Sequence, residues 1–209
     1  MDRQPENGGN VRRRLDPAVR RNLILDAAAK LVLSDGLTAV SMERIAREAG
    51  ISKALVYSYF GNQNALLSGL LLREYRAFQK EARAAGQAVT GLEEVVRATT
   101  RAYLDHVAAR GSLIQRLMTE PAIAAALKEL ETANRPITAA FFAEQIASER
   151  GVDVKTAALA SQLLMGLTRA AGDHLAEIGA DPATLEPLVV AMIMASLGGL
   201  QRSVDPAAQ

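Results

Sequence analysis

The chain has 209 residues, of which 49% are hydrophobic and 22% charged, and this composition is typical of a globular protein that buries a core. The 24 basic and 23 acidic residues nearly cancel, so overall charge selects no partner. The absence of cysteine excludes disulfides, thiolate zinc sites and cysteine nucleophiles. With only His106 and His174 left, far apart in sequence, we expect no metal and no cofactor.

No segment predicts export or insertion into a membrane. The longest apolar run, Leu188 to Leu200, has 13 residues including two glycines, whereas a membrane span needs roughly 20. Residues 1–14 are polar and lack the apolar stretch of a signal peptide. We therefore expect a soluble, cytoplasmic protein without a membrane partner.

Charge is distributed unevenly along the chain. Residues 1–63 contain 10 basic and 7 acidic residues, a net charge of +3. Five of the basic residues lie between positions 12 and 21, and such a cluster favours polyanions because binding releases counterions. A solvated tail has the same composition, and charge alone favours that interpretation. We expect residues 1–15 to form a disordered basic arm.

Nearly every segment beyond the arm has helical periodicity, and strand-type alternation is missing, so the sequence predicts an all-α fold. In the first predicted helix, Asp16 is placed to cap free amides and Pro17 suits the first helical position. Apolar residues from Ile24 to Val32 recur at helical spacing and form one stripe. Gly36 is expected to end this helix with a positive φ.

Two short helices follow. Ser41 is placed to cap the first and Ser52 the second, and residues 49–51 separate them. Gly50 in this turn can adopt the left-handed conformation that lets the second helix leave at a steep angle. This arrangement is the sequence form of a helix-turn-helix.

The remaining chain predicts longer helices. A Thr90-x-x-Glu93 capping box is expected to begin one of them, Pro136 to break or kink another, and Asp153 and Asp181 to cap the last two. The predicted helices cover about residues 65–85, a stretch from the capping box to residue 110, and residues 112–118, 121–150, 154–178 and 182–202.

The second short helix presents a chemically distinctive surface. If Val56 and Phe60 point into the core, other residues of this helix face outward, with Leu55 and Tyr59 at the margins. In a DNA major groove, lysine can meet guanine acceptors, small apolar groups can meet a thymine methyl, and tyrosine hydroxyls can hold phosphates. The alternative is that the tyrosines pack against the following helix. The outward set is Lys53, Ala54, Tyr57 and Ser58.

Residues 37–67 resemble the DNA-binding domain of the tetracycline-repressor (TetR) family of bacterial transcription regulators. The resemblance covers about residues 20–70 and joins an Ala-x-x-Ala-Gly turn, a Leu-Val-Tyr-x-x-Phe helix and an Asn-x-x-Ala-Leu-Leu start of the next helix. Gln63 stands where many members carry lysine, and the arginines of the arm are expected to compensate. The DNA contacts that charge and resemblance together predict are Arg12, Arg13, Arg14, Ser41, Arg44, Ser52, Lys53, Ala54, Leu55, Tyr57 and Tyr59.

The resemblance further implies a homodimer in which a C-terminal helical domain binds a small effector and dimerises through its last two helices. The expected organisation is the arm at 1–15, a three-helix DNA-binding domain at 16–63, and an effector-binding and dimerisation domain at 64–204. Residues 188–200 are apolar around most of a helix and include small residues that allow close approach. The core of a monomer could bury the same helix.

An effector pocket is expected between the helices of the C-terminal domain, where a few polar groups in apolar surroundings are typical of ligand sites. Each candidate is also a plausible core or surface residue. The candidates are Tyr75, Phe78, Tyr103, His106, Met118, Phe141, Phe142, Gln145, Met165, Arg169 and His174.

The sequence therefore predicts a ligand-responsive, dimeric transcriptional repressor that binds double-stranded DNA at a near-palindromic operator and is released by a small molecule. A helical enzyme is disfavoured, because the chain has no P-loop, Gly-x-Gly-x-x-Gly, Gly-x-Ser-x-Gly or His-Glu-x-x-His motif. The remaining alternative is a helical ligand-binding or scaffold protein that does not contact DNA.

Overall fold

The computed structural model describes residues 16–204, with side chains up to residue 200, so Arg12, Arg13 and Arg14 lie outside the described part of the chain. Over residues 16–204 it consists of helices without a strand, and the all-α prediction is confirmed. In chain order the elements are α1 (Pro17–Asp35), the 3-10 turn η1 (Leu37–Ala39), α2 (Met42–Glu48), α3 (Lys53–Tyr59), α4 (Gln63–Gln87), α5 (Leu92–Met118), α6 (Pro121–Arg150), α7 (Val154–Ile178) and α8 (Pro182–Val204).

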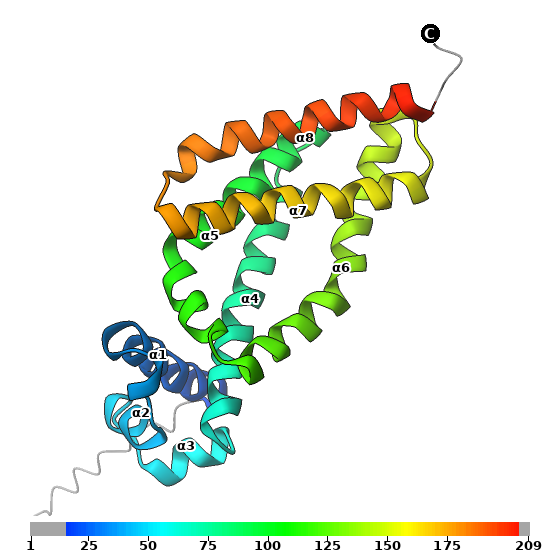
Figure 1. The fold of residues 1–209 in the computed structure, drawn as a ribbon. Helices are drawn as coiled ribbons and strands as arrows, with labels where there is room; N and C mark the ends of the chain where they lie inside the picture. The colour runs from blue at the N-terminus through cyan, green and yellow to red at the C-terminus, as the bar shows by residue number, and fades with distance from the viewer. Residues whose placement is uncertain (1–15, 205–209) are drawn as a thin grey trace, which may run out of the picture.

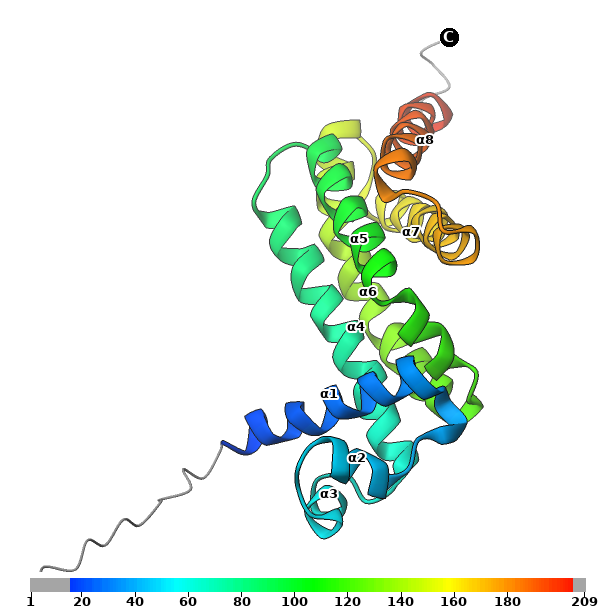
Figure 2. The ribbon, with the colours of Figure 1, turned by 90° about the vertical axis from the view of Figure 1, so that its left-hand side faces the viewer.

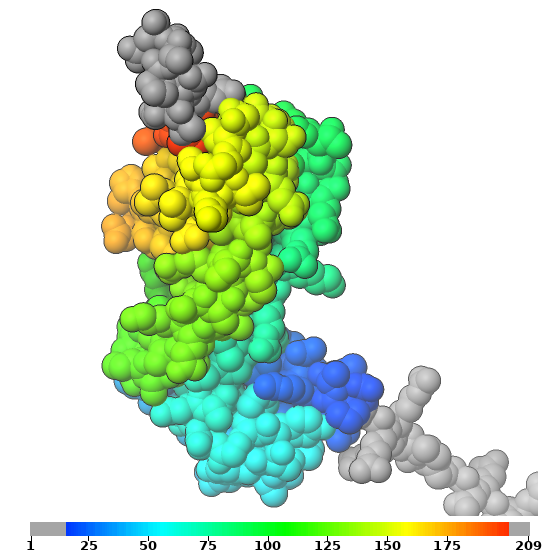
Figure 3. All heavy atoms as spheres, turned by 90° about the vertical axis from the view of Figure 1, so that its right-hand side faces the viewer, coloured from blue at the N-terminus to red at the C-terminus, as the bar shows by residue number. Residues whose placement is uncertain are grey.

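The helices form a head and a bundle. The head, α1 to α3, lies at one end of the molecule, and α4, α5 and α6 run away from it (Figure 1). α7 and α8 lie across the far ends of these helices, on the side opposite α4 (Figure 2). In the space-filling view, α3 and the start of α4 form the outermost tip (Figure 3). The bundle comprises α4 to α8.

Several helix starts follow the predicted capping pattern. The Asp16 carboxylate accepts the Ala18 N–H at 2.7 Å, and the Ser41 and Ser52 hydroxyls each accept an N–H three residues on at 3.2 Å. Asp153 accepts two amides at the start of α7, both at 3.0 Å. α4 begins at Gln63, earlier than expected, because the Asn62 side chain accepts the Ala65 N–H at 2.8 Å.

Two expectations about the bundle are wrong. The capping box does not form, because α5 starts after Gly91 and the Leu92 N–H is bonded instead to the Glu149 carboxylate of α6, 2.6 Å away. α5 continues through Gly111, so residues 112–118 are not a separate helix. At Pro136 a break or a kink was expected: α6 continues through this residue without a break, and it bends along its course (Figure 1).

Buried apolar side chains gather in two clusters. The lower core joins α1 to α3 with one end of α4, α5 and α6, including Leu70, Leu117 and Ile123, each with no more than a trace of exposure. The upper core joins α5, α6, α7 and α8, including Val190 and Leu197. The head thus shares one apolar cluster with the near ends of three bundle helices.

One described helix, over Pro182–Leu200, is long and apolar enough to cross a membrane by length and composition, with a mean hydropathy of 1.7 over its window. The expectation that this segment is too short is wrong, because the residues before the apolar run extend it to 19. In the fold this helix lies against α5 and α7, and its inward side contributes to the upper core.

Candidate DNA-binding surface and effector region

The turn between α2 and α3 has the predicted geometry. Gly50 has a φ of 66°, and the Ile51 N–H donates to the Ala46 carbonyl at 3.0 Å. Ile45 and Val56 are fully buried and pack in the lower core, which fixes the angle between the two helices. The sequence therefore folds into a helix-turn-helix with α3 at the tip of the molecule.

α3 presents the predicted outward surface. Lys53, Ala54 and Ser58 are exposed, and Tyr57 is 44% exposed despite its aromatic ring. Leu55 is half-buried, and Tyr59 packs against the lower core. Each of the two interpretations therefore holds for one tyrosine: Tyr57 is available to a partner, whereas Tyr59 packs in large part against the lower core.

A second cation that sequence reasoning missed lies beside this surface. Arg47, in the last turn of α2, and Lys53, at the start of α3, both face Glu43, at 3.7 and 4.0 Å. All three side chains are well exposed, so these pairs are weak and the two cations can exchange Glu43 for a phosphate. The spacing Arg44-x-x-Arg47 was the available signal, because residues three apart share a helix face.

Arg44 is engaged within the chain. Its guanidinium is paired with Asp35 at the end of α1 and donates to the Ala39 carbonyl of η1 at 2.8 Å. Hydrogen bonds from Ser34 and Arg44 lower the pKa of the Asp35 carboxyl. In this conformation Arg44 joins α1, η1 and α2, and it is not part of the free surface of α3.

The two capping serines can donate a hydrogen bond while they cap their helices. The hydroxyl oxygens of Ser41 and Ser52 accept backbone amides, and each hydroxyl retains one hydrogen that it can donate. A phosphate oxygen at either helix start could accept that hydrogen together with free backbone amides. The predicted phosphate contacts are therefore compatible with the capping role.

In the bundle, the predicted effector residues separate into three groups. The first group lies between the two cores, and we call it the middle layer. The Phe78 ring lies 5.4 Å from the Tyr103 ring, 5.5 Å from His106 and 6.5 Å from Tyr75, measured between centroids. Arg169 of α7 belongs to the same layer and is paired with Glu131 of α6 at 2.9 Å. The members of the middle layer are Tyr75, Phe78, Tyr103, His106, Glu131 and Arg169.

Burial sets the protonation behaviour of the middle layer. Burial, and secondarily the Asp173 carboxylate, raises the pKa of Tyr103 to about 12. Burial lowers the pKa of His106 against the opposing pull of Glu74 and Glu81. The Nε2 atom of His106 is buried without a hydrogen-bond partner among the described residues. A buried polar atom in this state costs free energy, so the layer can gain stability from a ligand that supplies the missing partner.

Gly172 of α7 leaves the space that the Tyr103 side chain occupies. A Cβ at position 172 would lie 2.5 Å from the Tyr103 hydroxyl oxygen, closer than atoms can approach. Only glycine allows the tyrosine side chain to lie directly on α7. Tyr103 of α5 therefore contacts α7 and, through Phe78, α4.

The second group lies higher in the bundle. Phe142 and Met165 line a cavity of about 40 Å³, and the Phe141 ring lies 5.1 Å from the Phe142 ring. Three threonines and Ser161 also line it, without a charged side chain. A cavity of this size has room for no more than a few water molecules, so it accepts a larger ligand only if the helices separate. Its lining residues are Val96, Thr99, Thr100, Phe142, Ile146, Ser161, Leu164, Met165, Thr168, Ile193 and Leu197.

The third group belongs neither to the middle layer nor to the small cavity. Met118, at the end of α5, is 42% exposed, and His174 is exposed on α7. The Gln145 side chain donates to the Phe141 carbonyl of its own helix at 3.4 Å. The structure thus brings five of the predicted effector residues together in the middle layer and three around the small cavity.

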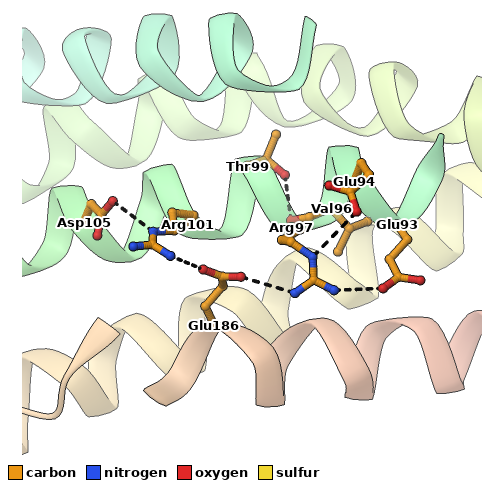
Figure 4. Close-up of polar contacts among 8 residues, drawn as sticks. All are labelled: Glu93, Glu94, Val96, Arg97, Thr99, Arg101, Asp105 and Glu186. Carbon is orange, nitrogen blue, oxygen red and sulfur yellow. Dashed lines mark hydrogen bonds and ion pairs between the residues drawn. The ribbon is translucent and has the colours of Figure 1, made fainter. Parts of the chain in front are cut away.

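An ion network holds α8 on α5 (Figure 4). Glu186 is 6% exposed, and its carboxylate accepts hydrogen bonds from Arg97 at 3.4 Å and from Arg101 at 2.9 Å. Arg97 also pairs with Glu93 at 2.8 Å, and Arg101 with Asp105 at 3.6 Å. This network fixes the position of α8 relative to α5, and no sequence pattern indicated it.

α7 and α8 also present apolar side chains that the chain itself does not cover. Leu159 and Leu163 of α7 are 64% and 79% exposed, and Leu188 and Met192 of α8 are also exposed. Single exposed apolar residues are ordinary, but these recur at helical spacing on two adjacent helices. Over residues 16–204, no group of three or more His, Asp or Glu side chains is placed to hold a metal ion.

Comparison with known proteins agrees with this geometry. The family model for bacterial regulatory proteins of the tetR family matches residues 24–70. The regulator BetI of Rhizobium meliloti is 37% identical over 83 residues, which are 40% of this chain and 41% of BetI. The transcriptional activator FasR of Mycolicibacterium smegmatis is 29% identical over 133 residues, 61% of this chain and 60% of FasR. The chain thus spans less than two thirds of these relatives.

Solved structures share the whole fold. A transcriptional regulator from Pseudomonas aeruginosa superposes with a TM-score of 0.75 at 20% identity, over 91% of this chain and 96% of that one. FadR of Bacillus subtilis, solved in complex with stearoyl-CoA, superposes with a TM-score of 0.66 at 18% identity, over 82% of this chain and 96% of FadR. Residues 24–70, which hold the helix-turn-helix, thus match the tetR family of bacterial regulatory proteins, and the fold of nearly the whole chain is shared with the solved structures.

Proposed function

We propose that this protein is a ligand-responsive transcriptional regulator that binds double-stranded DNA through α3 and acts as a homodimer in the cytoplasm. The observation that carries the proposal is the free surface of α3, where Lys53, Ala54 and Tyr57 project from a capped, internally buried helix at the tip of the molecule. Two such helices in successive major grooves would lie about 34 to 36 Å apart on a near-palindromic operator.

The proposed domain organisation is the one expected from the sequence: an arm at 1–15, a DNA-binding domain at 16–63, and an effector-binding and dimerisation domain at 64–204. In this proposal the base contacts come from Lys53, Ala54 and Leu55. Tyr57, Ser41 and Ser52 hold phosphates, and Arg47 joins them. The arginines at 12, 13 and 14 add phosphate contacts from the arm.

The exposed apolar side chains of α7 and α8 support the homodimer. Leu159, Leu163, Leu188 and Met192 form a surface that a second copy of the chain would cover. Small residues on α8, among them Ala195 and Ser196, allow two helices to approach closely. In a dimer joined at this face, the two heads would project in the same direction and reach neighbouring grooves of one duplex.

We propose that the effector binds in the middle layer. Its aromatic rings, the Arg169–Glu131 pair and the partnerless Nε2 of His106 combine apolar surface with a few polar groups, the mixture found in ligand sites. FadR of Bacillus subtilis, with the same fold, holds stearoyl-CoA, which supports a response to a small molecule. We propose that binding disfavours the DNA-bound arrangement, so that the protein acts as a repressor released by its effector.

The test is selection from a pool of randomised duplexes, repeated at increasing salt concentration. The proposal predicts enrichment of a near-palindrome and a steep loss of affinity with salt, because phosphate contacts release counterions. If the full chain enriches no sequence, alone or with cell extract as a source of effector, the proposal is wrong and the protein is a helical ligand-binding or scaffold protein.

A further inference from the structure

Two arginines from the bundle hold α1 of the head. Arg73 of α4 donates to the Asp26 carboxylate at 2.6 Å and to the Asn22 carbonyl at 3.5 Å, near the middle of α1. Arg116 of α5 donates to the Val32 and Leu33 carbonyls at 2.6 and 2.8 Å, in the last turn of α1. Two different bundle helices therefore contact α1, at positions about 9 Å apart along its axis.

Arg116 supplies something that α1 lacks. The last turn of α1 has no basic residue of its own, although helix ends carry unsatisfied carbonyls and a partial negative charge. The Arg116 guanidinium meets both needs from α5, across a sequence separation of more than 80 residues. Its neighbours Leu113 and Leu117 are buried in the lower core, so the backbone that carries Arg116 is firmly placed.

The contact at Asp26 also leads to α5. Arg73 pairs with its neighbour Glu74 at 2.9 Å, and Glu74 is 4% exposed. The other Glu74 oxygen lies 3.5 Å from Nε of Arg110 on α5. Alternating charges thus run from α1 through α4 to α5, in the order Asp26, Arg73, Glu74, Arg110. Because Glu74 is buried between the two arginines, a displacement of α5 must also disturb the contact between α4 and α1.

α5, which carries Arg110 and Arg116, also carries two residues of the middle layer. Arg110 follows His106 by one helical turn, and Tyr103 lies one turn further back on α5. A ligand that moves these rings moves the segment from which Arg110 and Arg116 reach the head. In the head, α3 packs in the lower core with α1, so the orientation of α1 sets the direction in which α3 points.

We propose that Arg73 and Arg116 are positioning residues that fix the angle of the head on the bundle, and with it the separation between half-sites that the dimer accepts. This inference rests on the proposed function, because it presupposes a dimer that reads two half-sites. Neither arginine belongs to the α3 surface. Their removal is therefore expected to change how far apart the two α3 helices lie and to leave the sequence read by each α3 unchanged.

The experiment uses the full chain and duplexes that carry two copies of the selected half-site, separated by spacers of every length from zero to about one helical turn. The wild type, Arg73→Ala, Arg116→Ala and the double variant are compared by sequencing the retained duplexes. Lys128→Ala, an exposed cation of α6, is the matched control. Thermal unfolding of each variant shows that it is folded at the selection temperature.

The wild type and Lys128→Ala are expected to favour one spacing. In the double variant, the preference for that spacing over the neighbouring lengths should fall by about fivefold or more, the scale of a typical coupling between sites, while half-site sequence preference is retained. If the alanine variants do not fold, Asp26→Asn and Arg116→Lys replace them, since both keep the size of the side chain and should broaden the spacing to a smaller degree.

Unchanged spacing preference in folded variants would overturn the inference while leaving the proposed function intact. Loss of half-site sequence preference together with spacing would also overturn it, because the arginines would then act on the reading surface itself. A wild type that enriches single half-sites but no pair would remove the dimer on which the inference rests.

Discussion

The head and the bundle use polar side chains in different ways. In the head, the contacts that begin the two short helices are local: Ser41 and Ser52 each accept an amide three residues on in sequence. In the bundle, the decisive contacts join distant parts of the chain, as where Glu186 of α8 accepts from Arg97 and Arg101 of α5. Local contacts define the two short helices of the head, whereas the shape of the bundle depends on how its long helices meet.

This difference suits the proposed roles. A reading surface must hold its side chains in one geometry, and short capped helices around Ile45 and Val56 provide that. An effector site must instead allow two arrangements of similar free energy. The middle layer, with a partnerless His106 atom and a tyrosine fitted against Gly172, lies between two well-packed cores and is the part of the bundle best suited to rearrange.

The largest expected effect comes from weakening each of the two cores by the same substitution. Leu117→Ala in the lower core and Leu197→Ala in the upper core each remove a fully buried leucine, and each should lower the free energy of unfolding by about 2–5 kcal/mol. Hydrogen exchange should separate them: Leu117→Ala should accelerate exchange in α1 to α3, and Leu197→Ala should spare these helices. Equal acceleration in the head would show that the two cores do not act separately.

The fit of Tyr103 against α7 gives a smaller expected effect. Gly172→Ala places a methyl group 2.5 Å from the tyrosine, so the ring must move, and overpacking of this kind should cost about 1–3 kcal/mol of stability. Gly111→Ala is the matched control, because its Cβ would meet only ordinary contacts at 3.5 Å and beyond. Urea denaturation of the two variants measures the difference. Equal stability would mean that Tyr103 is not held against α7.

Removing a single cap tests the local contacts of the head. Ser41→Ala deletes the acceptor for the Arg44 N–H and should cost about 1 kcal/mol. The same change at Ser112, an exposed position inside α5, should be neutral or slightly stabilising, because alanine is the better helix former. Shifts of the urea midpoint compare the two. A neutral Ser41→Ala would show that packing alone, without caps, places α2.

The smallest expected effect is on the stability of the fold at alkaline pH. Because Tyr103 has a pKa of about 12 in the folded chain and near 10 when unfolded, the folded state keeps its proton longer. Its contribution to stability is complete below about pH 10 and is lost as the pH rises toward 12. Tyr103→Phe should therefore show a shallower loss of stability above pH 10, measured by urea denaturation. Parallel losses in both proteins would contradict the buried, protonated tyrosine.

The same contrast explains what the sequence could predict. The helix-turn-helix, its caps and the outward set on α3 were predicted correctly, because Gly50, Ser41 and Ser52 act on residues within one helical turn. The capping box at Thr90 does not form, because the Leu92 N–H at the start of α5 donates instead to Glu149, which is 57 residues from Leu92 in sequence. Arg44 has the right spacing for a DNA contact, yet Asp35 and the Ala39 carbonyl hold its guanidinium. Periodicity cannot reveal which distant group will compete for a side chain.

The effector region shows the same limit. Phe78, Tyr103 and His106 were expected in the interior and do meet there, because aromatic residues on inward helical positions pack together. Met118 and His174 were expected with them and lie at the surface, because the ends of α5 and the outer side of α7 leave them uncovered. Which helices cover a given face depends on the crossing of α7 and α8 over α5, and that crossing has no local signature.

The role of α3 in DNA binding is tested by the affinity of the full chain for its selected duplex when the α3 surface is altered. Lys53→Ala combined with Tyr57→Phe should weaken binding by about 1–3 kcal/mol, relax the base preference and reduce the salt dependence, whereas Lys128→Ala should leave all three unchanged. If the double variant binds the selected duplex as tightly and as selectively as the wild type, α3 is not the reading helix and the account is wrong.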